Sequence, residues 1–164
     1  MKANFHFEQF SPRRKKDVVL FLKKLGPRTR SNLSVSGIDT KGIYHSFRLE
    51  WKTSLPICLY KNKEVIGICK LKRFEKKSMY LSCLVIVDRL QGLRFGSRLL
   101  NYSFAIAKFA GMERMYLEVK KDNKIAKKCF EKHGFLFKKE DQETYMMVKK
   151  LRRCPRREQR NNWK

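Results

Sequence analysis

The stretch Asp88–Leu100, DRLQGLRFGSRLL, joins a long apolar run to a segment whose apolar residues recur with helical spacing. The apolar run, residues 80–87, is typical of a strand that is covered on both faces. The loop after it contains three small residues that permit close approach to the backbone: Gly92, Gly96 and Ser97. A helix that begins near Phe95 would direct its free N–H groups toward this loop. The pattern suits a bound phosphate, although from the glycines alone a tight structural turn is an equal alternative.

Two common phosphate motifs are missing from this loop. It lacks the lysine spacing of a Walker A motif, and it does not read as GxGxxG. A dinucleotide site is therefore not expected.

The patterning outside this stretch predicts an α/β (α+β) fold with a mixed sheet and helices on its faces. The strands are expected at residues 5–10, 56–62, 64–74, 78–87, 114–119, 135–141 and 144–151. The helices are expected at residues 13–25, 95–111 and 123–134, with Ser11 and Pro12 opening the first and Gly26 and Pro27 ending it. Residues 28–51 predict loops or short helical pieces.

Length and composition predict one domain, residues 1–151, followed by a basic tail, residues 152–164. No apolar run approaches the roughly 20 residues of a membrane span, and the first residues lack the apolar block of a signal peptide. We therefore expect a cytoplasmic protein with no membrane partner. The five cysteines are odd in number and lack metal-type pairing, and the three histidines are scattered, so reduced core cysteines and no metal site are expected.

The charge is strongly unbalanced, with 40 basic and 15 acidic residues and a formal net charge of +25. Residues 13–30 and residues 149–164 each contain eight basic residues and one acidic residue. Such segments favour a polyanion, so RNA, DNA or a nucleoprotein is the expected partner. The alternative is that the basic ends only keep the protein in solution.

The sequence LVIVDRLQGLRFGSRLL, residues 84–100, is followed after one helix by LEVKKDNKIAKKCFEKHGF, residues 117–135. Together they resemble the GNAT superfamily of N-acetyltransferases, whose signature is Gln/Arg-x-x-Gly-x-Gly/Ala and then Asn-x-x-Ala, a tyrosine and Gly-Phe. The matching positions are Gln91, Arg94, Gly96, Asn123, Ala126, Phe130, Gly134 and Phe135. The piece LEVKKDN is most similar to the bacterial enzymes that acetylate the N-termini of ribosomal proteins. The resemblance implies a mostly antiparallel central sheet with splayed central strands.

The resemblance also implies a site for acetyl-CoA or another acyl-CoA. The central strand would pair through its backbone with the pantetheine arm, and the loop would wrap the pyrophosphate. The cofactor-binding residues implied are Leu84, Val85, Ile86, Gln91, Gly92, Leu93, Arg94, Phe95, Gly96, Ser97, Asn123 and Phe130. Arg94 stands where the signature has its first glycine, and with Arg98 it can add positive charge.

Glu118 resembles the general base of the ribosomal-protein enzymes, and the alternative is a solvated or salt-bridged glutamate. Phe130 stands where the family has a tyrosine that protonates the leaving thiolate, and a phenyl ring has no proton to give. Tyr145, Cys129 or water are possible donors, and an unassisted thiolate is another possibility. Asn123 is expected to cap the helix that follows it.

These residues predict an acetyl-CoA-dependent N-acetyltransferase that acts on a primary amine, on an acceptor associated with nucleic acid. That acceptor would be a ribosomal or nucleoid protein, an aminoacyl-tRNA or a modified base. The alternative is a catalytically silent GNAT-fold protein that binds nucleic acid. Tyr44, Phe47 and Trp51 would line the acceptor groove or belong to the core.

Overall fold

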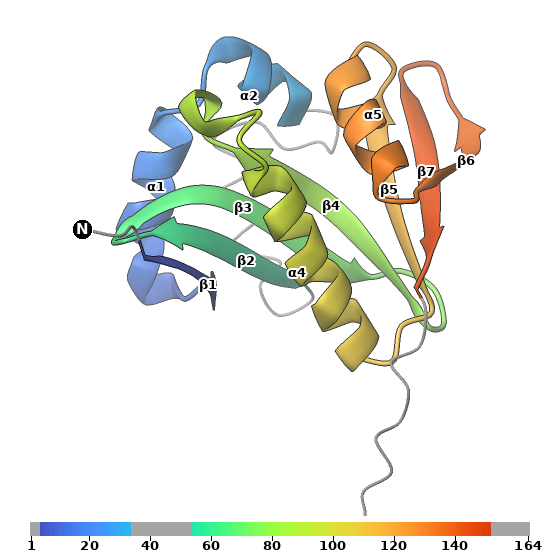
Figure 1. Ribbon diagram of the computed structural model, residues 1–164, viewed down its shortest axis with the longest axis horizontal. Helices are drawn as coiled ribbons and strands as arrows, with labels where there is room; N and C mark the ends of the chain where they lie inside the picture. Colours follow the sequence, from blue (N-terminus) through green and yellow to red (C-terminus); the bar gives the residue numbers. More distant parts are fainter. Residues whose placement is uncertain (1–3, 34–53, 152–164) are drawn as a thin grey trace, which may run out of the picture.

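A computed structural model describes residues 4–33 and 54–151 of the chain (Figure 1). The strands are β1 Phe5–Gln9, β2 Ser54–Lys61, β3 Glu64–Arg73, β4 Ser78–Ile86, β5 Arg114–Lys120, β6 Leu136–Glu140 and β7 Thr144–Lys150. The α-helices are α1 Lys15–Lys23, α2 Pro27–Leu33, α4 Phe95–Phe109 and α5 Lys124–Lys132, with 3-10 turns η1 Pro12–Arg14 and η3 Asp88–Leu90. None of the helices in these ranges is long and apolar enough to cross a membrane.

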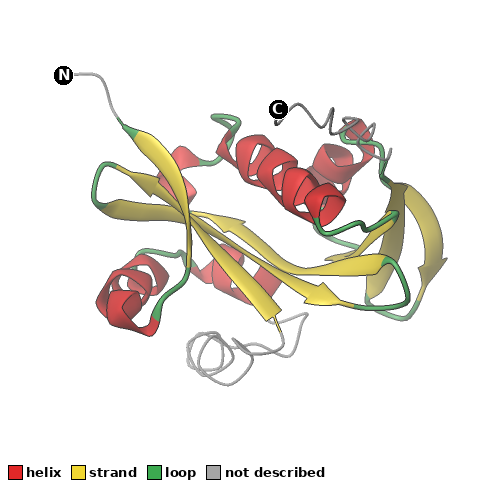
Figure 2. Cartoon of the chain, turned by 90° about the horizontal axis from the view of Figure 1, so that it is seen from below, coloured by secondary structure: helices red, strands yellow, loops and turns green. Residues whose placement is uncertain are grey.

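The described strands form one seven-stranded sheet in the order β1-β2-β3-β4-β5-β7-β6. Among these strands the one parallel pair is β4 with β5, and the other neighbours run antiparallel. Helices α4 and α5 cover one face of the sheet, while α1 and α2 lie on the other (Figure 2). The mixed, mostly antiparallel sheet expected from the sequence is confirmed.

The first helical segment differs from its prediction. The pattern predicts one helix over residues 13–25, but the α-helix begins only at Lys15, after η1, and ends at Lys23. Pro27, predicted as part of a stop, opens the second helix α2. Proline fits the first turn of a helix because its φ is already helical and its missing N–H would have no partner there. A residue predicted to end the first helix therefore begins the second.

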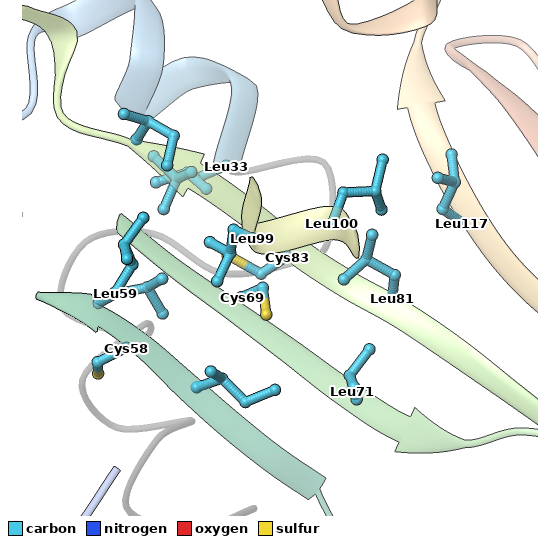
Figure 3. Packing of buried hydrophobic residues seen from close by; sticks show 14 of the residues in the cluster. Leu33, Cys58, Leu59, Cys69, Leu71, Leu81, Cys83, Leu99, Leu100 and Leu117 are labelled. Atoms are coloured by element: carbon cyan, nitrogen blue, oxygen red, sulfur yellow. The ribbon is translucent and has the colours of Figure 1, made fainter. Parts of the chain in front are cut away.

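The core lies on both faces of the sheet, under α4 on one side and under α1 and α2 on the other (Figure 3). Leu99 and Leu100 of α4 are fully buried over β3 and β4, and each such leucine contributes roughly 1.5–3 kcal/mol through burial. In β3, a Cβ on Gly67 would lie 2.5 Å from Cδ1 of Ile86 and 3.2 Å from the carbonyl oxygen of Val85. A glycine is needed here because the end of β4 packs directly on β3.

The free cysteines agree with their prediction where the structure describes them. Cys58, Cys69 and Cys83 are buried and Cys129 is half-buried, all as thiols. Cys154, together with the whole predicted tail 152–164, lies outside the described residues.

The two central strands part from each other halfway along their length. The parallel pairing of β4 and β5 ends at Leu81 and Leu117, although β4 continues to Ile86 and β5 to Lys120. Beyond this point each strand stays paired on its outer side, β4 with β3 and β5 with β7. Ser82 is an extra residue in β4 opposite β3, a bulge that bends the strand. The inner edges of the two strands therefore present backbone groups that are not paired with each other.

Candidate active site

A cleft of about 330 Å³ opens where β4 and β5 part. One wall is formed by residues 80–86 of β4, and the other by residues 117–120 of β5 and one side of α5. Helix α2 contributes Arg28, Thr29, Asn32 and Leu33, and the loop before α4 contributes Asp88, Gln91 and Gly92. In Figure 1, α2 and α5 flank the end of the sheet at which the two strands diverge.

Nine of the predicted site residues line this cleft: Leu84, Val85, Ile86, Gln91, Gly92, Gly96, Glu118, Asn123 and Phe130. The side chains of the other four lie elsewhere. Leu93 is 60% exposed, Arg94 is exposed, and the ring of Phe95 packs on Phe5 with 5.2 Å between centroids. The Ser97 side chain lies close enough to Cys129 to act on the pKa of its thiol. Any contact of Leu93 or Phe95 with a ligand in the cleft would therefore come from the backbone.

The loop backbone turns through the left-handed region twice. Gly92 has φ +80° and Arg94 has φ +64°. Arg94 is the N-cap residue of α4, and its carbonyl accepts a hydrogen bond from the Arg98 N–H at 3.1 Å, while its side chain makes no capping bond. Because Gly96, the second residue of α4, lines the cleft, the positive end of the helix dipole lies at the cleft. This arrangement suits an anion bound at the start of α4.

Hydrogen bonds fasten this loop to α2. The Asp88 carboxylate accepts from the Gly26 N–H at 2.9 Å and from the Thr29 hydroxyl at 2.7 Å. The Gln91 side-chain amide donates to Thr29 Oγ1 at 3.1 Å and to the Ile86 carbonyl at 3.0 Å. Gln91, predicted from the family signature, therefore also holds the loop against β4 and α2.

Glu118 lies at the point where the strands part. It is the first residue of β5 beyond the last pair with β4, its side chain is exposed, and it lines the main cleft. It also lines a second hollow, formed with residues 141–144 of the β6–β7 turn. Tyr80 lines the same cleft, and the charge of the Glu118 carboxylate raises the pKa of the Tyr80 hydroxyl. The predicted base thus stands between two spaces, with a tyrosine nearby.

Phe130 presents its ring to the cleft and is 9% exposed, packed edge-on against Phe135 at 5.8 Å between centroids. Of the proton donors suggested in its place, Cys129 lines the cleft, and burial raises the pKa of its thiol. Tyr145 does not line the cleft: its ring lies between the ammonium groups of Lys121 and Lys127, 5.5 Å from each. Tyr145 is therefore a poorly placed donor.

Asn123 caps α5 as predicted. Its side-chain oxygen accepts from the Ala126 N–H at 3.2 Å. The same side chain lines the cleft, so capping and ligand contact are compatible.

Sequence reasoning missed two contributions to the cleft. The first is α2, whose residues lie in a segment with no clear periodicity. The second is Tyr80: the bulge at Ser82 interrupts the alternation of β4, and all residues from 80 to 86 line the cleft, so no periodic pattern marked this position. Tyr44, Phe47 and Trp51, predicted for the acceptor groove or the core, lie outside the described residues. Among the described residues, no cluster of His, Cys, Asp and Glu has the arrangement of a metal site.

A sheet with one parted parallel pair, and a glycine loop that leads from the parted strand into a helix at the cleft, is the arrangement of a group-transfer enzyme that holds an extended donor between strands. The acetyltransferase (GNAT) family model matches residues 30–135, well over half of the chain. The chain belongs to the GNAT family of acetyltransferases. It is accordingly an acyltransferase, and the acyl donor of this family is acetyl-CoA. This membership favours the enzyme over the catalytically silent alternative.

Solved structures with the same fold include several acetyltransferases. The PaiA N-acetyltransferase of Thermoplasma acidophilum, solved in complex with coenzyme A, is 16% identical with a TM-score of 0.74, over 90% of this chain and 99% of that one. An acetyltransferase from Thermus thermophilus is 19% identical with a TM-score of 0.76, over 90% and 97%. The GNAT domain of S. lividans PAT is 16% identical with a TM-score of 0.78, over 88% and 89%. No curated protein matches the sequence.

Proposed function

We propose that this protein transfers the acetyl group of acetyl-CoA, or the acyl group of a related acyl-CoA, to a primary amine, with Glu118 as general base. The observation that carries the proposal is the parted inner edge of β4, which faces the cleft beside the start of α4. A strand edge offers N–H and C=O groups at the spacing that an extended amide-bearing ligand can pair with. The pantetheine arm of coenzyme A is such a ligand.

The residues present fit the pantetheine arm and the pyrophosphate of this donor. The backbone of Leu84, Val85 and Ile86 would hold the pantetheine amides. The loop from Gly92 to Ser97 and the first turn of α4 would hold the pyrophosphate, with Arg94 adding positive charge. Gly96 leaves the space open, since a Cβ there would meet only Leu84 and Ile86, at 3.8 and 3.9 Å.

Glu118 is placed to act on an amine that approaches from the second hollow. A lysine amine, with a pKa near 10.4, must lose a proton before it attacks, whereas an α-amine near 8 needs less help. Because Glu118 borders both spaces, it can take this proton while the acyl group lies in the cleft. Three acidic residues close to this hollow, Glu118, Asp141 and Glu143, favour a cationic acceptor there.

We further propose that the acceptor is associated with nucleic acid, with ribosomal-protein N-termini as the first class to test. The support is the +25 charge and the similarity of LEVKKDN to the enzymes that act on ribosomal proteins. RNA or DNA would bind to the basic segments 13–30 and 149–164, sequence-independently, and bring the acceptor amine to the cleft.

Donor binding is tested by thermal unfolding with increasing acetyl-CoA. The wild type should show a saturable rise in melting temperature, because a ligand that binds only the folded state stabilises it. Gly96→Leu should keep the fold and lose at least about tenfold in acetyl-CoA affinity, since its side chain fills the space beside Leu84. Gly96→Ala, the matched control, should lose much less. An unshifted wild type at millimolar acetyl-CoA would contradict the proposal.

The base is tested with the same protein and a panel of amine acceptors: a peptide with a free α-amine, an N-blocked lysine peptide and a ribosomal-protein N-terminal peptide. Release of the free CoA thiol reports turnover. Glu118→Gln should lower kcat by about 10²–10⁴ while acetyl-CoA affinity is kept. Full activity in Glu118→Gln would rule out this base.

A further inference from the structure

We propose that Tyr80 donates the proton that the departing thiolate of CoA takes up, the role that the ring of Phe130 cannot fill. The inference rests on the proposed acetyl transfer and adds a catalytic residue to it. No pattern in the sequence marked this tyrosine.

Tyr80 lies at the point where the two central strands part. Tyr80 lies on β4 opposite Tyr116 of β5, one residue before the last pair of the two strands. It is the only tyrosine among the described residues that line the cleft. Its ring is held from one side by Phe74, 5.5 Å away between centroids. The hydroxyl is therefore fixed where the strands begin to part.

Tyr80 also lies close to the proposed base. Both side chains line the cleft, on the two strands that part there, and the charge of the Glu118 carboxylate raises the pKa of the Tyr80 hydroxyl. A base and an acid placed in this way can exchange a proton directly or through one water. Of the alternative donors, Tyr145 lies outside the cleft lining, whereas the thiol of Cys129 lines the cleft and lies 3.9 Å from Nδ1 of His133.

The proton count of the step balances. Glu118 accepts the proton that the amine nitrogen gives up as the nitrogen–carbon bond to the acetyl group forms. Tyr80 gives its hydroxyl proton to the sulfur as the carbon–sulfur bond breaks and the sulfur keeps the bonding electron pair. Glu118 then passes its proton to the Tyr80 oxygen. Both side chains end as they began, and one proton has moved from nitrogen to sulfur.

The pKa of Tyr80 changes during the reaction in the direction that this sequence of proton transfers requires. Burial, and then the charge of Glu118, raise the pKa of Tyr80, so the hydroxyl is protonated before reaction. Once Glu118 has taken a proton, its negative charge is gone and its contribution to that increase is lost. Tyr80 becomes a stronger acid at the stage at which the sulfur needs a proton.

The kinetic test uses acetyl-CoA and the three peptide acceptors above. Tyr80→Phe should lower kcat by about 10²-fold or more, with the acetyl-CoA thermal shift unchanged. In the double variant Tyr80→Phe with Phe130→Tyr, a hydroxyl returns to the cleft from the opposite wall, and kcat should recover at least about tenfold. A purely structural role for Tyr80 would give no such rescue. Tyr145→Phe is the matched control and should keep wild-type kcat.

A second readout needs no turnover. In protein with ¹³Cζ-labelled tyrosine, the Tyr80 signal is the one missing from Tyr80→Phe. As pH rises, this signal should show the Tyr80 hydroxyl losing its proton at a lower pH in Glu118→Gln than in the wild type. The reason is that the Glu118 charge, which raises the pKa of Tyr80, has been removed. An unchanged titration, a Tyr80→Phe variant with full kcat, or a double variant without rescue would each overturn the inference. Failure of acetyl-CoA to bind the wild type would instead contradict the proposed function.

Discussion

Arg94 shows how one residue can depart from a signature while the loop keeps its shape. A side chain in the left-handed region costs roughly 1–2 kcal/mol, which is why the signature has glycine at this place. Here Arg94 adopts φ +64° and Gly92, two residues earlier, adopts φ +80°. The loop conformation is therefore kept at an energetic cost, and the arginine adds a charge near the start of α4.

Replacing Arg94 separates the backbone strain at this residue from the effect of its charge. Arg94→Gly should raise the free energy of unfolding by about 0.5–1 kcal/mol because the left-handed backbone is then unstrained. Arg94→Ala keeps the strain and should give no gain. Both variants lose the cation, so acetyl-CoA affinity should fall by the same few-fold in each. Denaturant unfolding and thermal shift measure the two quantities, and an equal stability gain in Arg94→Ala would refute the strain.

At the scale of elements, Asp88 joins parts of the chain that the sequence keeps far apart. Its carboxylate links η3, at the end of β4, to the turn between α1 and α2 through Gly26 and Thr29. Burial raises the pKa of Asp88, but the hydrogen bonds from the Gly26 N–H and the Thr29 hydroxyl outweigh it, and the pKa stays below its usual range. The carboxylate is thus stabilised by the α1–α2 turn.

Asp88→Asn should lower the free energy of unfolding by about 1 kcal/mol at neutral pH. The expected effect is small because Asp88 is exposed and water screens its charge. Because folding lowers the pKa of Asp88, its carboxylate stabilises the folded protein more at neutral pH than at acidic pH. The carboxylate contributes fully above its unfolded pKa of about 3.9, and the contribution is lost as pH falls through the lower folded value. The difference between wild type and variant should therefore shrink from about pH 5 to pH 3. Glu75→Gln, an exposed control, should show no such trend.

At the scale of the whole molecule, several acidic side chains within residues 4–33 and 54–151 form ion pairs. Glu8 pairs with Arg14, and Glu64 pairs with both Lys24 and Arg89. Further pairs occupy Glu113, Glu131 and Glu140. These pairs compensate part of the positive charge of segment 13–30 within the protein. Exposed residues of α1, such as Lys16 and Lys23, contribute to the positive charge that this segment presents to solvent.

Binding to an RNA or DNA oligonucleotide should therefore weaken steeply with salt, by about 10³-fold or more between 50 and 200 mM if six or more phosphates are contacted. Fluorescence anisotropy measures this slope. Lys16→Glu with Lys23→Glu should flatten the slope. Lys124→Glu with Lys128→Glu on α5 makes the same change in net charge and should flatten it less. Equal effects would show that net charge alone, not segment 13–30, determines binding.

Local patterns predicted most of the fold and part of the site. The strands, the long helix α4, the glycine loop and the Asn123 cap follow from alternation, helical spacing and capping, which act between residues close in the chain. The start of α2 at Pro27 was missed because proline serves both to end a helix and to begin one.

By itself the sequence determined the order of the strands, the family and the presence of Glu118, Asn123 and Phe130, because these depend on residue type and short spacing. Only the tertiary structure decided that β4 and β5 part after Leu81 and Leu117, and that Tyr80 meets Glu118. Those contacts join residues far apart in the chain, and they arise from strand register, the bulge at Ser82 and packing on Gly67, which no local pattern encodes.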